Sequence, residues 1–287
     1  MKRHKNSGSY GKAINECVQR RSLLDNIPHA TVRRSLVFDV LLARLARADH
    51  GLVLRGGFAM EMRFNAAPSS GDIDFSASKK LKVLSQSHEM GNFIKTRLED
   101  VLSTEYDRDD SHFEFRIQDA SSFLDQAGGF RYPVKVFIDG KEFETFNIDI
   151  GINDFMGAAS ELLSKTIDPS LGSGSSYKIE TVPLEQLFAE NLFKLQKAKD
   201  ESDDHTGAST LYDLYKIVSS DVNLDALRQV TKALFAHKER PLPSTLPEST
   251  TKQMTLLKNI LKERGALVKP EEVRSKVGFC VEEISSK

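Results

Sequence analysis

Cysteine is scarce in this chain of 287 residues. Its two cysteines, Cys17 and Cys280, lie near opposite ends of the sequence, and no metal-binding motif surrounds either of them. The sequence therefore argues against a disulfide-stabilised scaffold and against a structural zinc site. This cysteine usage suits a reducing compartment.

Long apolar runs are also missing. No stretch approaches the ~18 consecutive apolar residues of a membrane-spanning helix. The basic start, residues 1–5, is followed by a polar segment, residues 6–21, where a signal peptide would have its apolar region. We therefore expect a cytoplasmic protein with no membrane partner.

Neither sign of charge dominates. The 40 lysine and arginine residues nearly cancel the 41 aspartate and glutamate residues, which gives a formal net charge of -1. This balance argues against nucleic-acid binding through a generally basic surface, although it is compatible with a local basic cleft. The hydrophobic content of 39% and the charged content of 28% are typical of a soluble globular protein.

The amino-terminal part of the sequence predicts a mixture of helices and strands. Apolar residues three and four positions apart predict helices over residues 31–48 and 85–102, and residues 12–20 suit a shorter helix. Apolar residues at every second position predict strands over residues 112–117, 132–138 and 143–150, with a hairpin signal at Asp139-Gly140. We therefore expect residues 1–170 to form an α/β or α+β domain, with helices flanking a β-sheet.

The carboxy-terminal part predicts helices almost throughout. Residues 171–176 are rich in glycine and serine and have the composition of a linker. After a short strand at residues 177–181, apolar spacing predicts helices over residues 183–199, 209–219, 224–237, 250–264 and 270–284. We therefore expect residues 177–287 to form a separate helical bundle domain.

Residues 52–75 carry the densest chemical signal. A short apolar strand runs into Gly56-Gly57, a helix follows, and a second strand carries Asp72 and Asp74 with one apolar residue between them. Side chains alternate along a strand, so the two carboxylates point to the same face. A glycine turn lets a backbone approach a phosphate closely and aims amides at it. Together these features predict a site for a divalent metal and a nucleotide phosphate.

A third acid follows on a later strand. With Phe146, Ile148 and Ile150 on the core face, Asn147 and Asp149 point to the opposite face. If this strand neighbours the one with Asp72 and Asp74, three carboxylates ~5 Å apart repel each other by roughly 3 kcal/mol per pair at an effective dielectric constant of 20. A fold tolerates such a group when a cation sits among the acids or when they stay protonated.

The glycine turn and the acids, like the other charged groups of the sequence, also have ordinary structural explanations. Glycine pairs commonly make turns, and exposed strand ends often carry acids. Arg33, Arg44 and Arg47 on the helix at 31–48 read as a solvated face. The acidic loop at residues 200–205 lacks the spacing of a calcium-binding hand. The combination and order of the glycine turn and three acids are more specific than any one of them.

In this combination the sequence resembles the nucleotidyltransferase superfamily related to DNA polymerase beta, and within it the AbiEii/AbiGii toxin family. The resemblance covers roughly residues 50 to 220. It rests on the following matches: Arg55-Gly-Gly-Phe-Ala-Met60, Gly71-Asp-Ile-Asp-Phe75, Asp149, Ala189-Glu-Asn-Leu192 and Leu211-Tyr-Asp-Leu214. It implies a nucleotidyltransferase-type mixed sheet followed by a helical bundle.

The resemblance also implies roles for individual residues. Asp72, Asp74 and Asp149 would be the metal ligands and part of the catalytic set, and Gly56 and Gly57 would cradle the outer phosphates, with Arg55 and Arg63 near them. Further on, Lys194 and Asp213 would complete the catalytic set, with Lys197 behind Lys194.

The sequence departs from the family pattern at two places. Pro68 stands where the family has an arginine before the acids, and Asn191 stands where it has a lysine. Lys194 lies about one helical turn beyond Asn191, rotated by ~60°, so its longer side chain could reach the same cleft. A solvated helix lysine is the ordinary alternative for Lys194, and a solvated acid is the alternative for Asp213.

These residues lead to one leading hypothesis and two rivals. The resemblance implies a Mg²⁺-dependent enzyme that moves an NMP from an NTP to the hydroxyl of an RNA end, with tRNA 3′ ends as the first expectation. It would be the toxin of a type IV toxin–antitoxin or abortive-infection (phage defence) system, restrained by an antitoxin. The rivals are a nucleotidyltransferase that modifies a small molecule or a protein, which the near-neutral charge suits, and a non-catalytic nucleotide-binding module, which Asn191 and Pro68 favour.

Overall fold

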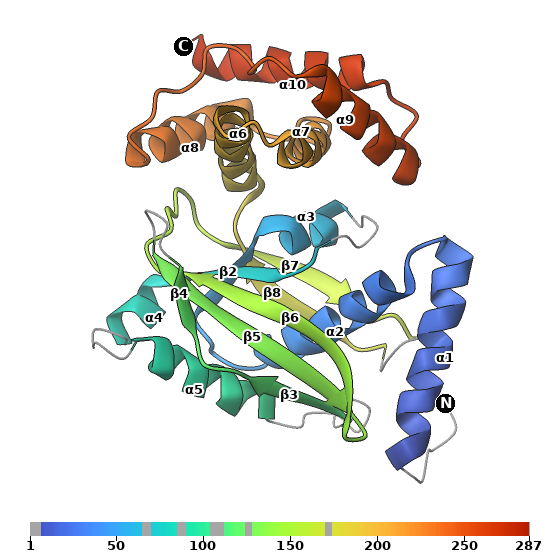
Figure 1. Cartoon of the computed structure of the whole chain (residues 1–287). Helices are drawn as coiled ribbons and strands as arrows, with labels where there is room; N and C mark the ends of the chain where they lie inside the picture. The colour runs from blue at the N-terminus through green and yellow to red at the C-terminus, as the bar shows by residue number, and fades with distance from the viewer. Residues whose placement is uncertain are drawn as a thin grey trace. The chain divides into compact units, whose positions relative to one another are not determined.

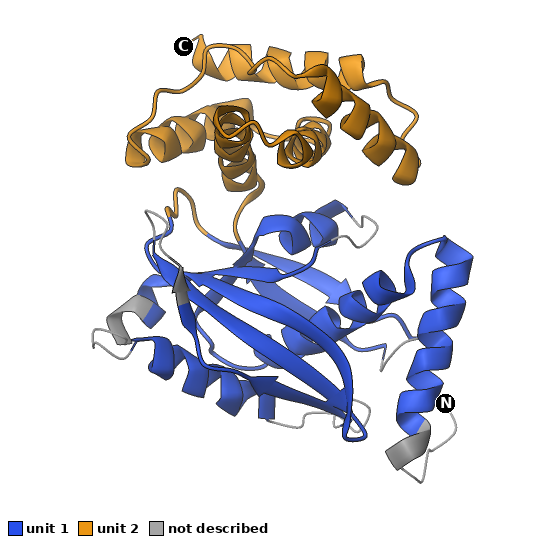
Figure 2. Cartoon of the chain, viewed as in Figure 1, with its two compact units in different colours: residues 1–154, 160–181 blue, residues 155–159, 182–287 orange. Residues whose placement is uncertain are grey.

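The chain folds into two compact units, as a computed structural model shows (Figure 2). The structure describes residues 7–64, 70–84, 90–103, 112–123, 128–169 and 174–286. Unit 1 comprises Met1–Asp154 and Ser160–Thr181, and unit 2 comprises Phe155–Ala159 and Val182–Lys287. Pro68, the first part of the predicted helix at 85–102 and the first half of the predicted linker lie outside the described residues.

Unit 1 is built on one mixed β-sheet (Figure 1). Its strands are β1 Leu52–Arg55, β2 Ile73–Ala77, β3 Phe113–Ile117, β4 Ser121–Phe123, β5 Gly129–Ile138, β6 Lys141–Gly151, β7 Glu161–Thr166 and β8 Ser176–Thr181. They lie in the order β3-β5-β6-β2-β1-β8-β7, with β4 paired to β5. The β2–β6 and β1–β8 pairs are parallel and the other pairs antiparallel. This mixed sheet confirms the predicted fold class.

Helices of unit 1 flank the sheet. They are α1 Ser7–Asp25, α2 His29–Leu45, α3 Gly56–Phe64, α4 Lys79–Leu84 and α5 Met90–Ser103. The apolar stripe of α2 faces the core, where the Phe38 ring meets Phe58 of α3 at 5.1 Å and Phe146 of β6 at 4.9 Å between ring centroids. Because Phe146 faces α2, alternation along β6 turns Asn147 and Asp149 to the other side of the sheet.

The β5–β6 hairpin turns at the two residues that the sequence singles out. Asp139 and Gly140 have φ values of 52° and 74°, and positive values at both positions match the twist of a two-residue hairpin. The pairing Phe137–Glu142 is followed by Val136–Glu144, so Phe143 is an extra residue in β6. This bulge shifts every later pair by one residue and brings Arg131 opposite Asp149.

Unit 2 is helical, as predicted. Its helices are α6 Leu184–Asp200, α7 Asp204–Val218, α8 Leu224–His237, α9 Thr251–Glu263 and α10 Pro270–Ser285. Helix α6 packs against α7 and α8, and α7 packs against α9 and α10. Side chains cap the first turns of α7, α8 and α9, namely Asp203, Asn223 and Thr250.

A short segment outside the helical run also belongs to unit 2. Residues Phe155–Ala159 are held by the fully buried Gln186 of α6. The Gln186 amide donates to the Phe155 carbonyl oxygen at 2.6 Å and accepts from the Gly157 amide at 3.1 Å. The chain therefore passes between the units at three places, after residues 154, 159 and 181.

The division into units differs from the predicted boundary in strand β8 as well as in Phe155–Ala159. Strand β8, placed in the second domain by the sequence pattern, pairs with β1 and β7 and so belongs to the sheet of unit 1. Within the described residues, no helix combines the length and apolarity needed to cross a membrane.

Candidate active site

Two neighbouring strands of unit 1 bring the predicted acids to one face of the sheet. Strands β2 and β6 are parallel partners, and in their register Asp74 lies directly opposite Asp149. Paired strands lie about 5 Å apart, so the two carboxylates start from adjacent backbone positions. Asp72 precedes Asp74 by two residues and is half-buried like it, while Ile73 and Phe75 between and after them are buried.

The glycine turn lies directly against the second of these acids. Gly56, the first residue of α3, has a φ of +67°, which favours glycine. A Cβ atom at Gly56 would lie 2.3 Å from Oδ2 of Asp74, and one at Gly57 would lie 2.6 Å from Oγ of Ser70. The turn therefore has glycine where the backbone must make room for Asp74.

Hydrogen bonds fix the segment that leads into β2. Asp72 Oδ1 accepts from the backbone amide of Asn147 at 3.0 Å and from its side-chain amide at 3.1 Å. Upstream, the buried Glu61 accepts from both the amide and the hydroxyl of Ser70, at 2.7 and 2.8 Å. These contacts tie the loop to α3 on one side and to β6 on the other.

The third acid, Asp149, forms an ion pair with an arginine of the neighbouring strand. Arg131 of β5 donates from Nε and Nη2 to the two carboxylate oxygens of Asp149, at 2.8 and 2.6 Å. Hydrogen bonding to Asp149 and its negative charge raise the pKa of Arg131, and the charges of Asp72 and Asp74 raise it further. One guanidinium and three carboxylates thus form a single charged cluster.

The residues on this face suit a divalent metal by type and by backbone position. Carboxylate oxygens are the ligands that Mg²⁺ prefers. Among the described residues, however, no three acid, histidine or cysteine side chains are already grouped closely enough to hold a metal ion. Asn147 donates two hydrogen bonds to Oδ1 of Asp72, and Arg131 donates one to each oxygen of Asp149, so a bound metal would share these carboxylates with their present partners.

The two arginines expected to contact phosphates make contacts within unit 1. Arg55 pairs with the carboxylate of Asp154, which also accepts from Ser76 at 2.7 Å. Arg63, with a side chain 10% exposed, donates to Glu161 at 2.8 Å and to Thr181 at 2.9 Å. Contact of either arginine with a phosphate stays a prediction.

The remaining predicted site residues belong to unit 2. Lys194 is exposed on α6, and Lys197 lies 3.7 Å from Glu201 one turn later. Asn191, at the position of the family lysine, donates back to the Leu187 carbonyl of its own helix at 2.9 Å. Asp213 is half-buried on α7. A shared site of these residues with the acids of unit 1 stays a prediction.

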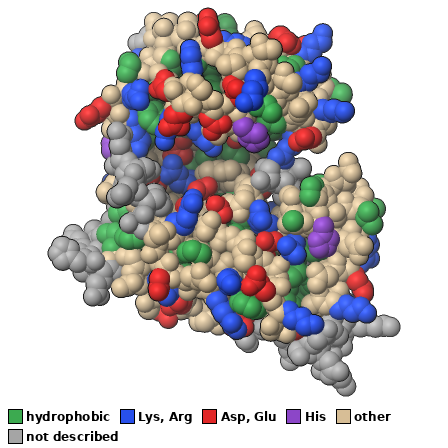
Figure 3. Space-filling view, viewed as in Figure 1, with side chains coloured by type: hydrophobic (Ala, Val, Ile, Leu, Met, Phe, Trp, Pro, Cys, Tyr) green, Lys and Arg blue, Asp and Glu red, His purple; other side chains and the backbone are tan. Residues whose placement is uncertain are grey.

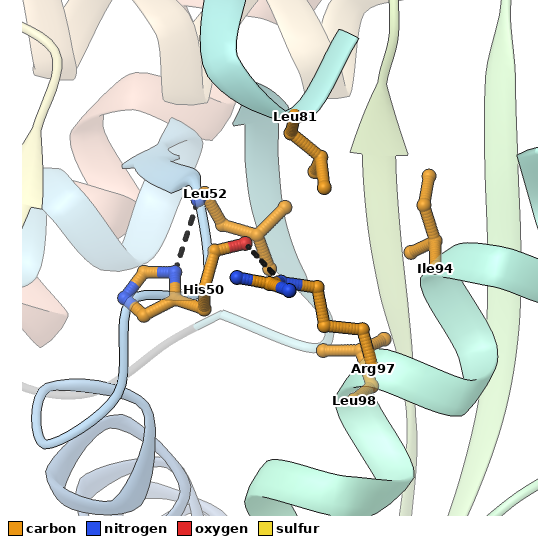
Figure 4. A pocket seen from close by; sticks show the side chains of 6 residues that line it. All are labelled: His50, Leu52, Leu81, Ile94, Arg97 and Leu98. Atoms are coloured by element: carbon orange, nitrogen blue, oxygen red, sulfur yellow. Dashed lines mark hydrogen bonds between the residues drawn. The ribbon is translucent and has the colours of Figure 1, made fainter. Parts of the chain in front are cut away.

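A small recess in unit 1 was not predicted from the sequence. It is lined by His50, Leu52, Leu81, Ile94, Arg97 and Leu98 (Figure 4). The two polar members contact backbone: His50 Nδ1 accepts from the Leu52 amide at 3.0 Å, and Arg97 donates to the His50 carbonyl at 3.4 Å. Burial lowers the pKa of His50 to about 4, so the ring is neutral at pH 7. The recess has the character of core packing rather than of a polar ligand site.

Comparison with known proteins identifies the family. Residues 40–271 match the family described as nucleotidyl transferase AbiEii toxin, type IV TA system. The chain belongs to this family. The matched region includes the glycine turn, all three acids and the helices that carry Lys194 and Asp213. An AbiEii protein is a nucleotidyltransferase toxin, so the resemblance seen in the sequence is confirmed.

Two further comparisons add little. No curated protein matches the chain. A crystal structure from H. pylori, described as a proposed nucleotidyltransferase, is similar at 16% identity with a TM-score of 0.47, over 90% of this chain and 96% of that one. A likeness of this extent does not bear on the function of the AbiEii chain.

Proposed function

We propose that this AbiEii protein is a Mg²⁺-dependent enzyme that transfers an NMP from an NTP to the hydroxyl of an RNA end, with tRNA 3′ ends as the first candidate acceptor. One observation carries the proposal: Asp74 lies opposite Asp149 on neighbouring strands and packs against Gly56 at the start of α3. In the proposed cellular role the enzyme arrests growth within a type IV toxin–antitoxin or abortive-infection system, and a cognate antitoxin restrains it.

The acids of unit 1 would organise the reaction. Asp72 and Asp74 would hold the divalent ion, and Asp149 would stand beside them near the incoming hydroxyl. When bound, the ion would offset negative charge on the triphosphate and on the departing pyrophosphate. The backbone amides at Gly56 and Gly57 would bind the outer phosphates, and glycine at position 56 permits the φ of +67° with which α3 begins.

Two residues of unit 2 complete the proposed mechanism. Lys194 would contact the triphosphate in place of the lysine that the family has at position 191. Asp213 would orient that lysine or the acceptor hydroxyl. The hydroxyl oxygen would attack the α-phosphorus in line and lose its proton to solvent, a new P–O bond would form, and the bond to the β-phosphate oxygen would break with release of pyrophosphate.

The charge distribution fits an acceptor bound locally rather than by a wide basic surface. The net charge is -1, and acidic and basic side chains intermingle over the visible face (Figure 3). The same balance favours a second candidate, an acceptor hydroxyl on a protein or a small molecule. Both candidates use the same acids.

The test is transfer of label from α-³²P-labelled NTPs, one at a time, to total RNA in the presence of Mg²⁺. We expect labelled RNA with the unmodified protein and at least ~100-fold less with Asp74→Asn, since the substitution removes a proposed metal ligand. Glu142→Gln is the matched control, because this exposed acid lies on β6 but at the hairpin end.

Three outcomes separate the candidates. Label in RNA that depends on Asp74 supports the proposal. Label in a protein or a small molecule, again dependent on Asp74, assigns the second candidate. Equal labelling by Asp74→Asn and Glu142→Gln would remove the acids from the mechanism.

A further inference from the structure

The pairing of strands β5 and β6 places Arg131 beside the acids. Strand β5 lies next to β6, and Arg131 stands in register with Asp149, whose neighbour on the other side is Asp74. Both hydrogen bonds of the pair are short, 2.8 and 2.6 Å, and run to separate carboxylate oxygens. Such two-point contacts are the strongest ion pairs that arginine makes with a carboxylate.

The pair is asymmetric in exposure. The Asp149 side chain is 16% exposed, whereas that of Arg131 is 47% exposed. The carboxylate is therefore fixed at the sheet surface, and the guanidinium is the partner that can swing into solvent without disturbing the strand. The charge of Asp149, and less strongly those of Asp72 and Asp74, raises the pKa of Arg131.

A divalent ion and this guanidinium would use the same atoms. Each oxygen of Asp149 directs one of its two lone pairs at Arg131, so fewer directions are left on this carboxylate for an ion. An ion among Asp72, Asp74 and Asp149 would also lie close to a second positive charge. Both effects oppose simultaneous occupation.

We propose that Arg131 is a built-in counter-cation that competes with the divalent metal for Asp149, so that metal loading requires the guanidinium to leave this carboxylate. The inference rests on the proposed function, because it assumes that the metal binds at the acids. Arg131 is a positioning residue in this scheme: it holds Asp149 in place when the metal is absent and weakens metal binding. The sequence alone gave no reason to single it out.

The test measures metal binding directly, without turnover. Mn²⁺ is added to the full-length protein, and the free ion is quantified by its electron paramagnetic resonance signal. We expect Arg131→Gln to bind Mn²⁺ about tenfold more tightly than the unmodified protein. Lys135→Gln is the matched control, since Lys135 lies on the same strand and face, is 45% exposed and pairs with Glu142 rather than with an acid of the site. It should leave the affinity unchanged.

A second measurement keeps the proposal testable if Arg131→Gln does not fold. In protein labelled with ¹⁵N-arginine, the Nε–H resonance of Arg131, assigned by its loss in Arg131→Lys, should move when Mg²⁺ is added. A resonance that stays in place at saturating Mg²⁺ would overturn the competition. So would unchanged or weaker Mn²⁺ binding in Arg131→Gln, or an equal gain in Lys135→Gln.

Failure of this inference can be told apart from failure of the proposed function. If Asp74→Asn and Asp149→Asn lower Mn²⁺ affinity while Arg131→Gln does not raise it, only the role of Arg131 is wrong. If neither acid substitution affects Mn²⁺ binding, the metal does not bind at these acids, and both proposals are overturned.

Discussion

The absence of a side chain at Gly56 allows the Asp74 carboxylate to occupy its position. The φ of +67° costs a residue with a Cβ about 1 kcal/mol, and the added atom would lie 2.3 Å from the Asp74 carboxylate. We therefore expect Gly56→Ala to lower the transfer rate by roughly 100-fold, because displacement of a catalytic group by about 1 Å has an effect of that size. The measurement is the rate of NMP transfer together with the free energy of unfolding.

Gly265 provides a control that separates strain from displacement. Its φ is +63°, close to that of Gly56, but no atom of the described residues lies within 4 Å of the position that a Cβ would take. Gly265→Ala should therefore lose about 1 kcal/mol of stability and keep its activity. Equal activity in the two alanine variants would show that contact with Gly56 does not position Asp74.

His50 makes stability depend on pH. Its pKa is lowered from 6.5 to about 4 by burial, so the unfolded chain takes up a proton below pH 6.5 while the folded chain does not. The free energy of unfolding should therefore fall by up to about 3 kcal/mol between pH 6.5 and pH 4, and it should not change through this group above pH 6.5. Urea denaturation at a series of pH values measures the effect.

His50→Asn isolates this contribution from that of the acids. Asparagine can offer an oxygen in place of Nδ1 to the Leu52 amide, but it does not titrate. The variant should lose less stability than the unmodified protein on acidification. Parallel curves for the two proteins would contradict the assignment to His50.

At the scale of strands and helices, periodicity predicted the elements that have one buried face. Strands β5 and β6 and helix α2 follow their apolar patterns closely. Strand β7 was not predicted, because it has no buried face that would produce alternation of apolar and polar residues. None of its residues is buried, and Leu162 is 65% exposed. Pairing with β8 holds this edge strand, and such pairing leaves little trace in the pattern.

The bulge at Phe143 explains why Arg131 could not be found from the sequence. The turn at Asp139-Gly140 was predicted, and a regular hairpin counted from that turn places Arg131 opposite Ile148, on the wrong face. The extra residue moves the partner of Arg131 to Asp149. A single inserted residue therefore decides which charge the third acid meets, and no turn rule predicts it.

Helix α6 allows a test of the substituted lysine. If Lys194 takes over the role of the family lysine, Lys194→Ala should lower NMP transfer by at least ~10-fold, and Asn191→Lys in the same chain should restore part of it. The restoring lysine replaces a side chain that donates to a carbonyl of its own helix, at a cost of about 1 kcal/mol or less in stability.

Lys199→Ala serves as the control for this series, because Lys199 is an exposed residue in the last turn of the same helix. Loss of transfer in the control as well would point to a general effect of helix charge. Full activity of Lys194→Ala would remove this residue from the mechanism.

At the scale of the whole molecule, the sequence predicted two parts with different architectures but not how the chain is shared between them. The glycine- and serine-rich stretch near residues 171–176 suggested a single crossing. The structure has three, because β7 and β8 return to the sheet after Phe155–Ala159 has joined the helical unit. The glycine- and serine-rich stretch falls between β7 and β8, which both belong to unit 1, and the pairing of β8 with β1 joins residues more than 120 positions apart.

This threading has a consequence for a chain cut by a protease. A single cut between residues 154 and 155 gives one fragment with β1–β6 and another with β7, β8 and all of the helical unit. The fragments would still be joined, because β8 of the second completes the sheet of the first beside β1. A nicked toxin of this kind would migrate as two bands under denaturing conditions and as one particle in its native state.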